Sequence, residues 1–217
     1  MATFAQSQNI PRTITVSGRG TASAPPDTAT INTGVETTAA TAQEALAANN
    51  RQFQSVLAVL SEQGIEDRDV QTSFFNVNPQ FRFGPNGEQL GITGYQVSNQ
   101  VRVIVRDIEK LGQILDALVA AGSNQVSGVS FSIEDNQEIT DTARAAAVAD
   151  ATRTAGVFAA AAGVKVGRLI AVSDQSIQAP EPPSFSLQAE AADVVPIASG
   201  ELEITSNVNL QFELVNA

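Results

Sequence analysis

The 217-residue chain carries 23 acidic and 12 basic residues, a formal net charge of −11, and contains neither cysteine nor histidine. The missing residue types exclude zinc sites built on Cys or His, thiol chemistry and histidine-based catalytic triads. The diffuse acidic balance argues against nucleic-acid binding, which requires clustered cations on the protein. No apolar run approaches the roughly 20 residues of a membrane-spanning helix, so we expect no direct membrane insertion.

The N-terminal residues do not resemble a secretory signal, because residues 1–11 are polar and lack a basic stretch followed by an apolar one. A protein that begins after a removed signal would look the same, so these residues do not decide the compartment. We interpret residues 1–11 as a flexible lead-in to a single domain over residues 12–217.

The first elements are two alternating strands followed by a capped helix. Thr13–Ser17 alternates apolar and polar residues, and Gly18-Arg19-Gly20 behind it predicts a bulge or turn. A lone GxG is weak evidence for a phosphate loop. A second strand covers Ala29–Val35, and Thr41–Glu44 forms a capping box for the helix that follows. The expected apolar face of that helix is Leu46, Phe53, Leu57 and Leu60.

An apolar helical stretch that ends in glycine and leads into a β-type run occurs three times. The glycine ends each helix by taking the left-handed conformation that other residues resist. The segments are Ser55–Gly64 leading to Val70–Val77, Leu111–Gly122 leading to Val126–Ile133, and Ala143–Gly163 leading to Gly167–Val172. This repeated unit specifies architecture rather than chemistry.

The third of these helices differs in composition, because eleven of the twenty residues from Ala143 to Ala162 are alanine. Such a helix can pack close to a sheet or to another helix. Its expected apolar stripe is Val148, Ala151, Ala155, Phe158 and Ala162.

Two apolar segments lie outside this helical pattern. Asn86-Gly87 stands between alternating flanks that include Phe81 and Phe83, which predicts a β-hairpin. The segment 179–199 is a Pro-rich excursion that we expect to lack regular structure. It nevertheless carries the apolar residues Phe185, Leu187, Val194 and Val195. The chain closes on a long strand with apolar residues at most even positions from 202 to 214.

These elements predict an α+β fold. Two strand–helix–strand units run from Ala29 to Val77 and from Tyr95 to Ile133, and each crossover is expected to lay its helix on one face of a sheet. The hairpin and the long C-terminal strand add antiparallel pairing. The expected architecture is therefore a mixed β-sheet with its helices packed on one face.

The order and spacing of several short segments resemble the SIMPL domain family of bacterial envelope proteins, over about residues 12–215. The matching segments are Ile14–Gly20, Pro26–Ala29, Thr41–Ala45, Gly64-Ile65, Asp69–Thr72, Tyr95–Asn99, Val105–Asp107, Gly128–Phe131 and Ala162–Val164. The resemblance implies a periplasmic or secreted, non-enzymatic protein that forms a ring-like homo-oligomer and is associated with envelope or oxidative stress. It brings no catalytic residue, cofactor or metal.

Acidic residues are the main candidates for chemistry. Neither Glu62/Glu66/Asp67/Asp69 nor Glu134/Asp135/Glu138/Asp141 has the loop spacing of a calcium site. A hydrolase built on a carboxylate pair, or on a serine with Lys110 or Lys165, is the least favoured hypothesis, because nothing in the sequence nominates a pair.

The apolar residues of the hairpin and the excursion favour a different hypothesis. Exposed apolar residues are a liability and need to be covered. We predict that the chain is a non-catalytic extracytoplasmic protein that assembles with itself, using these segments as contact arms. The alternative is a monomeric binding module for an apolar ligand or a protein partner. The candidate interface residues are Phe81, Phe83, Asn86, Gly87, Phe185, Leu187, Val194 and Val195.

Overall fold

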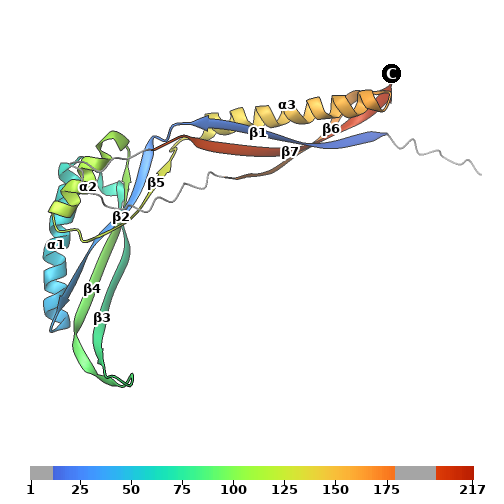
Figure 1. The fold of residues 1–217 in the computed structure, drawn as a ribbon. Helices are drawn as coiled ribbons and strands as arrows, with labels where there is room; N and C mark the ends of the chain where they lie inside the picture. The colour runs from blue at the N-terminus through green and yellow to red at the C-terminus, as the bar shows by residue number, and fades with distance from the viewer. Residues whose placement is uncertain (1–11, 179–198) are drawn as a thin grey trace, which may run out of the picture. The chain divides into compact units, whose positions relative to one another are not determined.

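The computed structural model describes residues 12–178 and 199–217, which gather into two compact units (Figure 1). The first unit comprises the described parts of residues 1–24, 135–181 and 201–217, and the second comprises those of residues 25–134 and 182–200. The expectation of one domain over residues 12–217 stays a prediction.

The second unit is a four-stranded sheet with two helices. Its elements are β2 (Thr28–Ala39), α1 (Ala42–Glu62), β3 (Val70–Phe83), β4 (Gln89–Val105), α2 (Leu111–Ala120) and β5 (Gln125–Ser132), with single 3-10 turns at Asp67–Asp69 and Ile108–Lys110. The strand order is β3-β4-β2-β5, and every pairing is antiparallel.

The α+β class and both strand–helix–strand units are confirmed. The two strands that each helix joins run parallel but are not neighbours, because β4 lies between β2 and β3 and β2 lies between β4 and β5. Each inserted strand runs the opposite way, so the sheet is antiparallel rather than mixed. The hairpin at Asn86-Gly87 is also confirmed, with Gly87 at φ 83° and its N–H donating to the Gly84 carbonyl at 3.0 Å.

The core of the second unit lies between one sheet face and the two helices. Ile31 and Val103 of the sheet are fully buried, as are Leu111 and Leu118 of α2. The capping box at Thr41 is confirmed. The buried face of α1 differs from the expected one, since Leu57 is 37% exposed. The buried residues of α1 are Ala45, Asn49, Phe53, Val56 and Leu60.

The buried side chain of Asn49 accounts for which face of α1 packs against the sheet. Its side-chain amide is completely buried and donates to the carbonyls of Val35 at 2.9 Å and Val97 at 3.1 Å, on two neighbouring strands. A buried polar group is costly unless it is paired, so these bonds keep Asn49 against the sheet. Leu57 therefore lies to one side of the contact.

The first unit is a three-stranded antiparallel sheet under one long helix. Its elements are β1 (Thr13–Ala24), α3 (Gln137–Ala161), β6 (Val164–Gln178) and β7 (Leu202–Asn216), with strand order β1-β7-β6. The predicted period of two in the C-terminal strand is confirmed, because Leu202, Ile204, Val208, Leu210 and Phe212 are all buried.

The Gly18-Arg19-Gly20 segment is neither a bulge nor a turn, so that prediction is wrong. It lies inside β1 in regular register with β7, with both glycines facing α3. A Cβ at Gly18 or Gly20 would stand less than 3.0 Å from a carbonyl oxygen of α3, that of Ala147 or Ala143 respectively. The glycines therefore allow the helix to rest directly on the strand backbone.

The same close approach corrects the predicted stripe of α3. Val148 and Phe158 are 39% and 58% exposed. The buried stripe is made of alanines spaced four residues apart, Ala143, Ala147, Ala151, Ala155 and Ala159. Only a methyl side chain fits where the helix backbone meets the glycines of β1.

Candidate functional site

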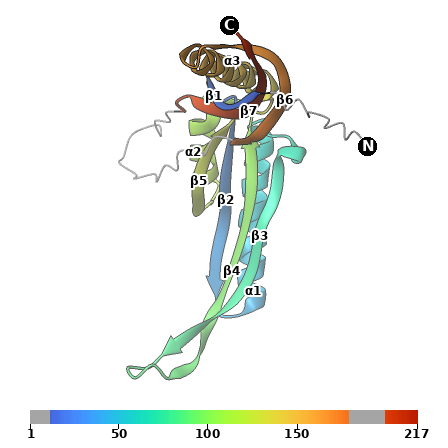
Figure 2. The same cartoon turned by 90° about the vertical axis from the view of Figure 1, so that its right-hand side faces the viewer.

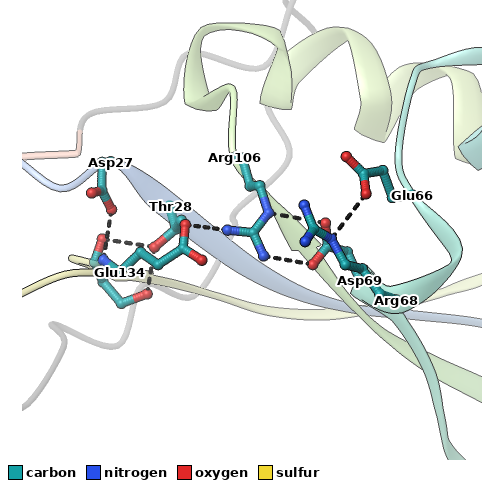
Figure 3. A network of polar contacts seen from close by, with 8 residues as sticks. Asp27, Thr28, Glu66, Arg68, Asp69, Arg106 and Glu134 are labelled. Carbon is teal, nitrogen blue, oxygen red and sulfur yellow. Dashed lines mark hydrogen bonds and ion pairs between the residues drawn. The ribbon is translucent and has the colours of Figure 1, made fainter.

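One end of the four-stranded sheet is closed by an ionic cluster of Asp27, Asp69, Arg106 and Glu134 (Figure 3). Asp27 and Asp69 stand immediately before β2 and β3, Arg106 immediately follows β4, and Glu134 follows β5. The antiparallel order brings these chain positions to one sheet end. We call this group the sheet-end cluster.

Arg106 is the centre of the sheet-end cluster. Its guanidinium donates to both carboxylate oxygens of Asp69, at 3.0 Å from Nε and 2.8 Å from the terminal nitrogen, and it also pairs with Glu134. The backbone N–H of Glu134 in turn donates to Asp27 at 2.9 Å. A two-bond contact between arginine and carboxylate fixes the orientation of both groups.

Asp69 and Arg106 hold each other in their ionised forms. The side chain of Asp69 is 5% exposed, yet the hydrogen bonds from Arg106 lower its pKa from the ordinary value, against the opposing effect of burial. The hydrogen bonds from Asp69 and Glu134 raise the pKa of Arg106. A carboxylate in this setting is a poor proton donor or acceptor near neutral pH.

A recess of about 260 Å³ adjoins the sheet-end cluster, and Gln63, Glu66, Asp69, Arg106, Lys110 and Ile114 contribute to its lining. Its charged groups are engaged in ion pairs: Lys110 pairs with Asp107 at 2.8 Å, and Glu66 pairs at 2.9 Å with Arg68, which lies outside the recess lining. The two acidic clusters of the sequence thus contribute one residue each, Asp69 and Glu134, to a single arginine. Within residues 12–178 and 199–217, no group of acidic side chains is gathered as a metal site.

A second feature of the second unit is an apolar surface on the β3–β4 hairpin. The backbone of this hairpin extends beyond the N-terminal end of α1 (Figure 2). β3 is an edge strand, and α1 lies mainly against β2 and β4. Seven large apolar side chains are between 37% and 63% exposed here. They are Phe74, Phe75, Val77, Phe81, Phe83, Leu90 and Ile92, which we call the hairpin surface. Phe74 and Phe75 are consecutive in β3 and pair with consecutive residues of β4, so this surface includes both faces of the hairpin.

The structure places four of the predicted interface residues together. Phe81 and Phe83 belong to the hairpin surface at 40% and 63% exposure, and Asn86 and Gly87 form the exposed turn at its tip. The other four, Phe185, Leu187, Val194 and Val195, lie outside the described residues. The predicted interface did not include Phe74, Phe75, Val77, Leu90 and Ile92, although β3 carries a single charge, Arg82, from Val70 to Phe83. A long strand with so few charges was the available signal.

Comparison with known proteins assigns the family. The family model of SIMPL, described as proteins of unknown function (DUF541), matches residues 14–212. The 26 kDa periplasmic immunogenic protein of Brucella melitensis is 37% identical, over 97% of this chain and 89% of that protein. The uncharacterized protein YggE of Escherichia coli is 27% identical, over 83% of this chain and 73% of that protein.

The chain therefore belongs to the SIMPL family, and the predicted resemblance is confirmed. It is an extracytoplasmic protein, periplasmic or secreted, in agreement with its Brucella relatives. In the part of the chain that the structure describes, no helix is long and apolar enough to cross a bilayer.

Proposed function

We propose that this protein is a non-catalytic component of the extracytoplasmic space that assembles with copies of itself through the hairpin surface. The observation that carries the proposal is the exposed apolar area of the hairpin, summed over both of its faces. Four half-exposed phenylalanines leave about 100 Å² each, and the three aliphatic residues bring the total to about 600 Å². A standard protein interface covers about 800 Å² per partner and is little more than half apolar.

The sheet-end cluster supports the non-catalytic part of the proposal. Asp69, the most buried acid of the cluster, is fixed as a carboxylate by Arg106 rather than poised to exchange a proton. The cluster joins the ends of four strands, a position that suits a structural role in stabilising the sheet. A ring-like assembly and a link to envelope or oxidative stress belong to the proposal through the family resemblance.

A pair of matched variants tests the assembly. Phe83→Asp places a charge in the hairpin surface, and Phe158→Asp places the same charge on α3 at a similar exposure, 58% against 63%. We expect light scattering to show a reduced mass for Phe83→Asp and the wild-type mass for Phe158→Asp. Equal masses for both variants and the wild-type protein would reject the hairpin surface as the contact.

The alternative hypothesis, a monomeric binding module, uses the same surface differently. Native mass spectrometry separates the two, since a binding module appears as a monomer with a bound apolar molecule. In that case Phe83→Asp would lose the bound molecule and leave the protein mass unchanged.

A further inference from the structure

The tip of the β3–β4 hairpin holds the one Asn-Gly pair of the whole sequence, Asn86-Gly87, and both residues are exposed. Asparagine is among the thermally labile residue types. It loses its side-chain amide when the backbone nitrogen of the following residue attacks the side-chain carbonyl carbon. A following glycine leaves that nitrogen open to close approach, because it has no side chain. The pair therefore joins a reactive sequence to an exposed position.

The reacting nitrogen lies in a three-residue loop between Gly84 and Glu88. The Gly87 N–H donates to the Gly84 carbonyl at 3.0 Å, and the Gly84 N–H donates to the Glu88 carbonyl at 2.8 Å. Pro85 at the second position and Gly87 at φ 83° are typical of a type I turn followed by a left-handed residue. The hydrogen bond to Gly84 therefore has to open before the Gly87 nitrogen can react.

This opening does not disturb the core of the unit. Residues 85–90 are all exposed. Segments with exposed backbone hydrogen bonds and few buried contacts open locally at a small fraction of the free energy of global unfolding. The Gly87 nitrogen can therefore leave Gly84 and reach the side chain of Asn86 while the sheet stays folded.

Other asparagines of the same unit are held more firmly. The amide of Asn49 is buried and bonded to two strands. The side chain of Asn124 donates to the Glu36 carbonyl at 2.8 Å and accepts from the Glu36 N–H at 2.7 Å. Asn99 lies within β4, which is paired on one side with β2 and on the other with β3. Ring closure at these positions requires regular structure to break.

We infer that Asn86 is a modification site, at which the side-chain amide becomes a carboxylate through a succinimide ring. The Gly87 nitrogen bonds to the side-chain carbonyl carbon of Asn86, the bond from that carbon to the amide nitrogen breaks, and ammonia leaves with the proton of the Gly87 N–H. Water then opens the ring. Opening at the side-chain carbonyl gives aspartate, and opening at the backbone carbonyl gives isoaspartate.

Both products change the hairpin tip. Each places a new negative charge in a segment, residues 82–90, whose charges are Arg82 and Glu88. Isoaspartate also adds one carbon to the backbone between Gly84 and Gly87, so the turn hydrogen bond cannot keep its geometry. The protein therefore acquires a charged and reshaped hairpin tip as it ages. This inference does not depend on self-assembly.

Peptide mapping tests the site with an internal control. Trypsin cleavage after Arg82 and Arg102 releases one peptide, residues 83–102, that contains both Asn86 and Asn99. After the full chain is incubated in mildly alkaline buffer, tandem mass spectrometry should find amide-to-acid conversion at Asn86, with isoaspartate in excess over aspartate, and none at Asn99. Asn86→Gln should lose the conversion, because its longer side chain would have to close a six-membered ring.

Conversion at Asn99 as fast as at Asn86 would overturn the assignment. The same incubation of Phe83→Asp covers the case in which another copy shields the tip of the wild-type protein. Conversion of Asn86 in that variant alone would still support the inference. Absence of conversion in both the wild-type protein and Phe83→Asp would overturn it, whatever the mass of the protein in solution.

Discussion

Arg106 is the residue on which the end of the four-stranded sheet depends. It is the common partner of Asp69 and Glu134, and Asp69 is almost fully buried. Removing the cation leaves a buried carboxylate without a counter-charge, which is far more costly than losing an exposed ion pair. The two kinds of pair are both present in this unit and can be compared directly.

Arg106→Gln is expected to lower the free energy of unfolding by more than the loss of an exposed pair does, because it leaves the Asp69 carboxylate, only 5% exposed, without its counter-charge. Arg68→Gln removes the exposed pair with Glu66 and should cost under about 1 kcal/mol. Urea denaturation at pH 7 measures both. Equal losses of unfolding free energy in the two variants would show that the Arg106 pair stabilises the fold no more than an exposed ion pair does.

The lowered pKa of Asp69 predicts an acid-dependent stability. A carboxyl whose pKa is lower in the folded state stabilises the fold above its unfolded pKa, about 3.9, and this contribution is lost as the pH falls through the folded value. Stability should therefore decline below about pH 4. In Asp69→Asn this decline should be shallower, which denaturation midpoints between pH 2 and 7 will show; an unchanged decline would assign the acid sensitivity to other groups.

Among the elements, β1 and α3 depend most on their smallest side chains. The helix rests on Gly18 and Gly20 through a stripe of alanines. The contact is between backbones, which cannot move aside as a side chain can. A single methyl group at this contact should therefore have a large effect.

Gly20→Ala is expected to destabilise the protein by about 1–3 kcal/mol, because the new Cβ would press on the backbone of α3. Gly156→Ala is the matched control: it lies in α3 with nothing within 4 Å of the added carbon and should stabilise by about 0.5–1 kcal/mol. Thermal denaturation distinguishes the two signs. A neutral Gly20→Ala would mean that the helix does not rest on β1 this closely.

The sequence predicts where the helices end better than which faces they bury. Gly64, Gly122 and Gly163 all adopt positive φ, 81°, 100° and 72°, because that conformation is a local property of glycine. The buried face of α3 depends on a distant pair of glycines in β1, and that of α1 depends on carbonyls of two strands reached by Asn49. The spacing of apolar residues contains no information about these distant contacts. It therefore predicts that Val148, Phe158 and Leu57 are buried, whereas all three are exposed.

The candidate site divides in the same way. The hairpin and its apolar flanks follow from local sequence, so Phe81, Phe83 and the Asn86-Gly87 turn were predictable. The sheet-end cluster was not, because its four members are brought together only by the strand order β3-β4-β2-β5. Asp69 and Glu134 come from the two acidic clusters whose spacing does not fit calcium, and Asp27 belongs to neither.

At the scale of the whole molecule, we propose that this extracytoplasmic SIMPL protein covers its apolar hairpin surface by binding its own copies. A family model that matches residues 14–212 includes parts of both units. The hairpin surface therefore lies within the matched part of the chain.

The most direct test is the mass of the wild-type protein in solution, measured by size-exclusion chromatography with light scattering across micromolar concentrations. We predict a mass that is a multiple of the 22.6 kDa chain. A single species at 22.6 kDa throughout this range would contradict self-assembly.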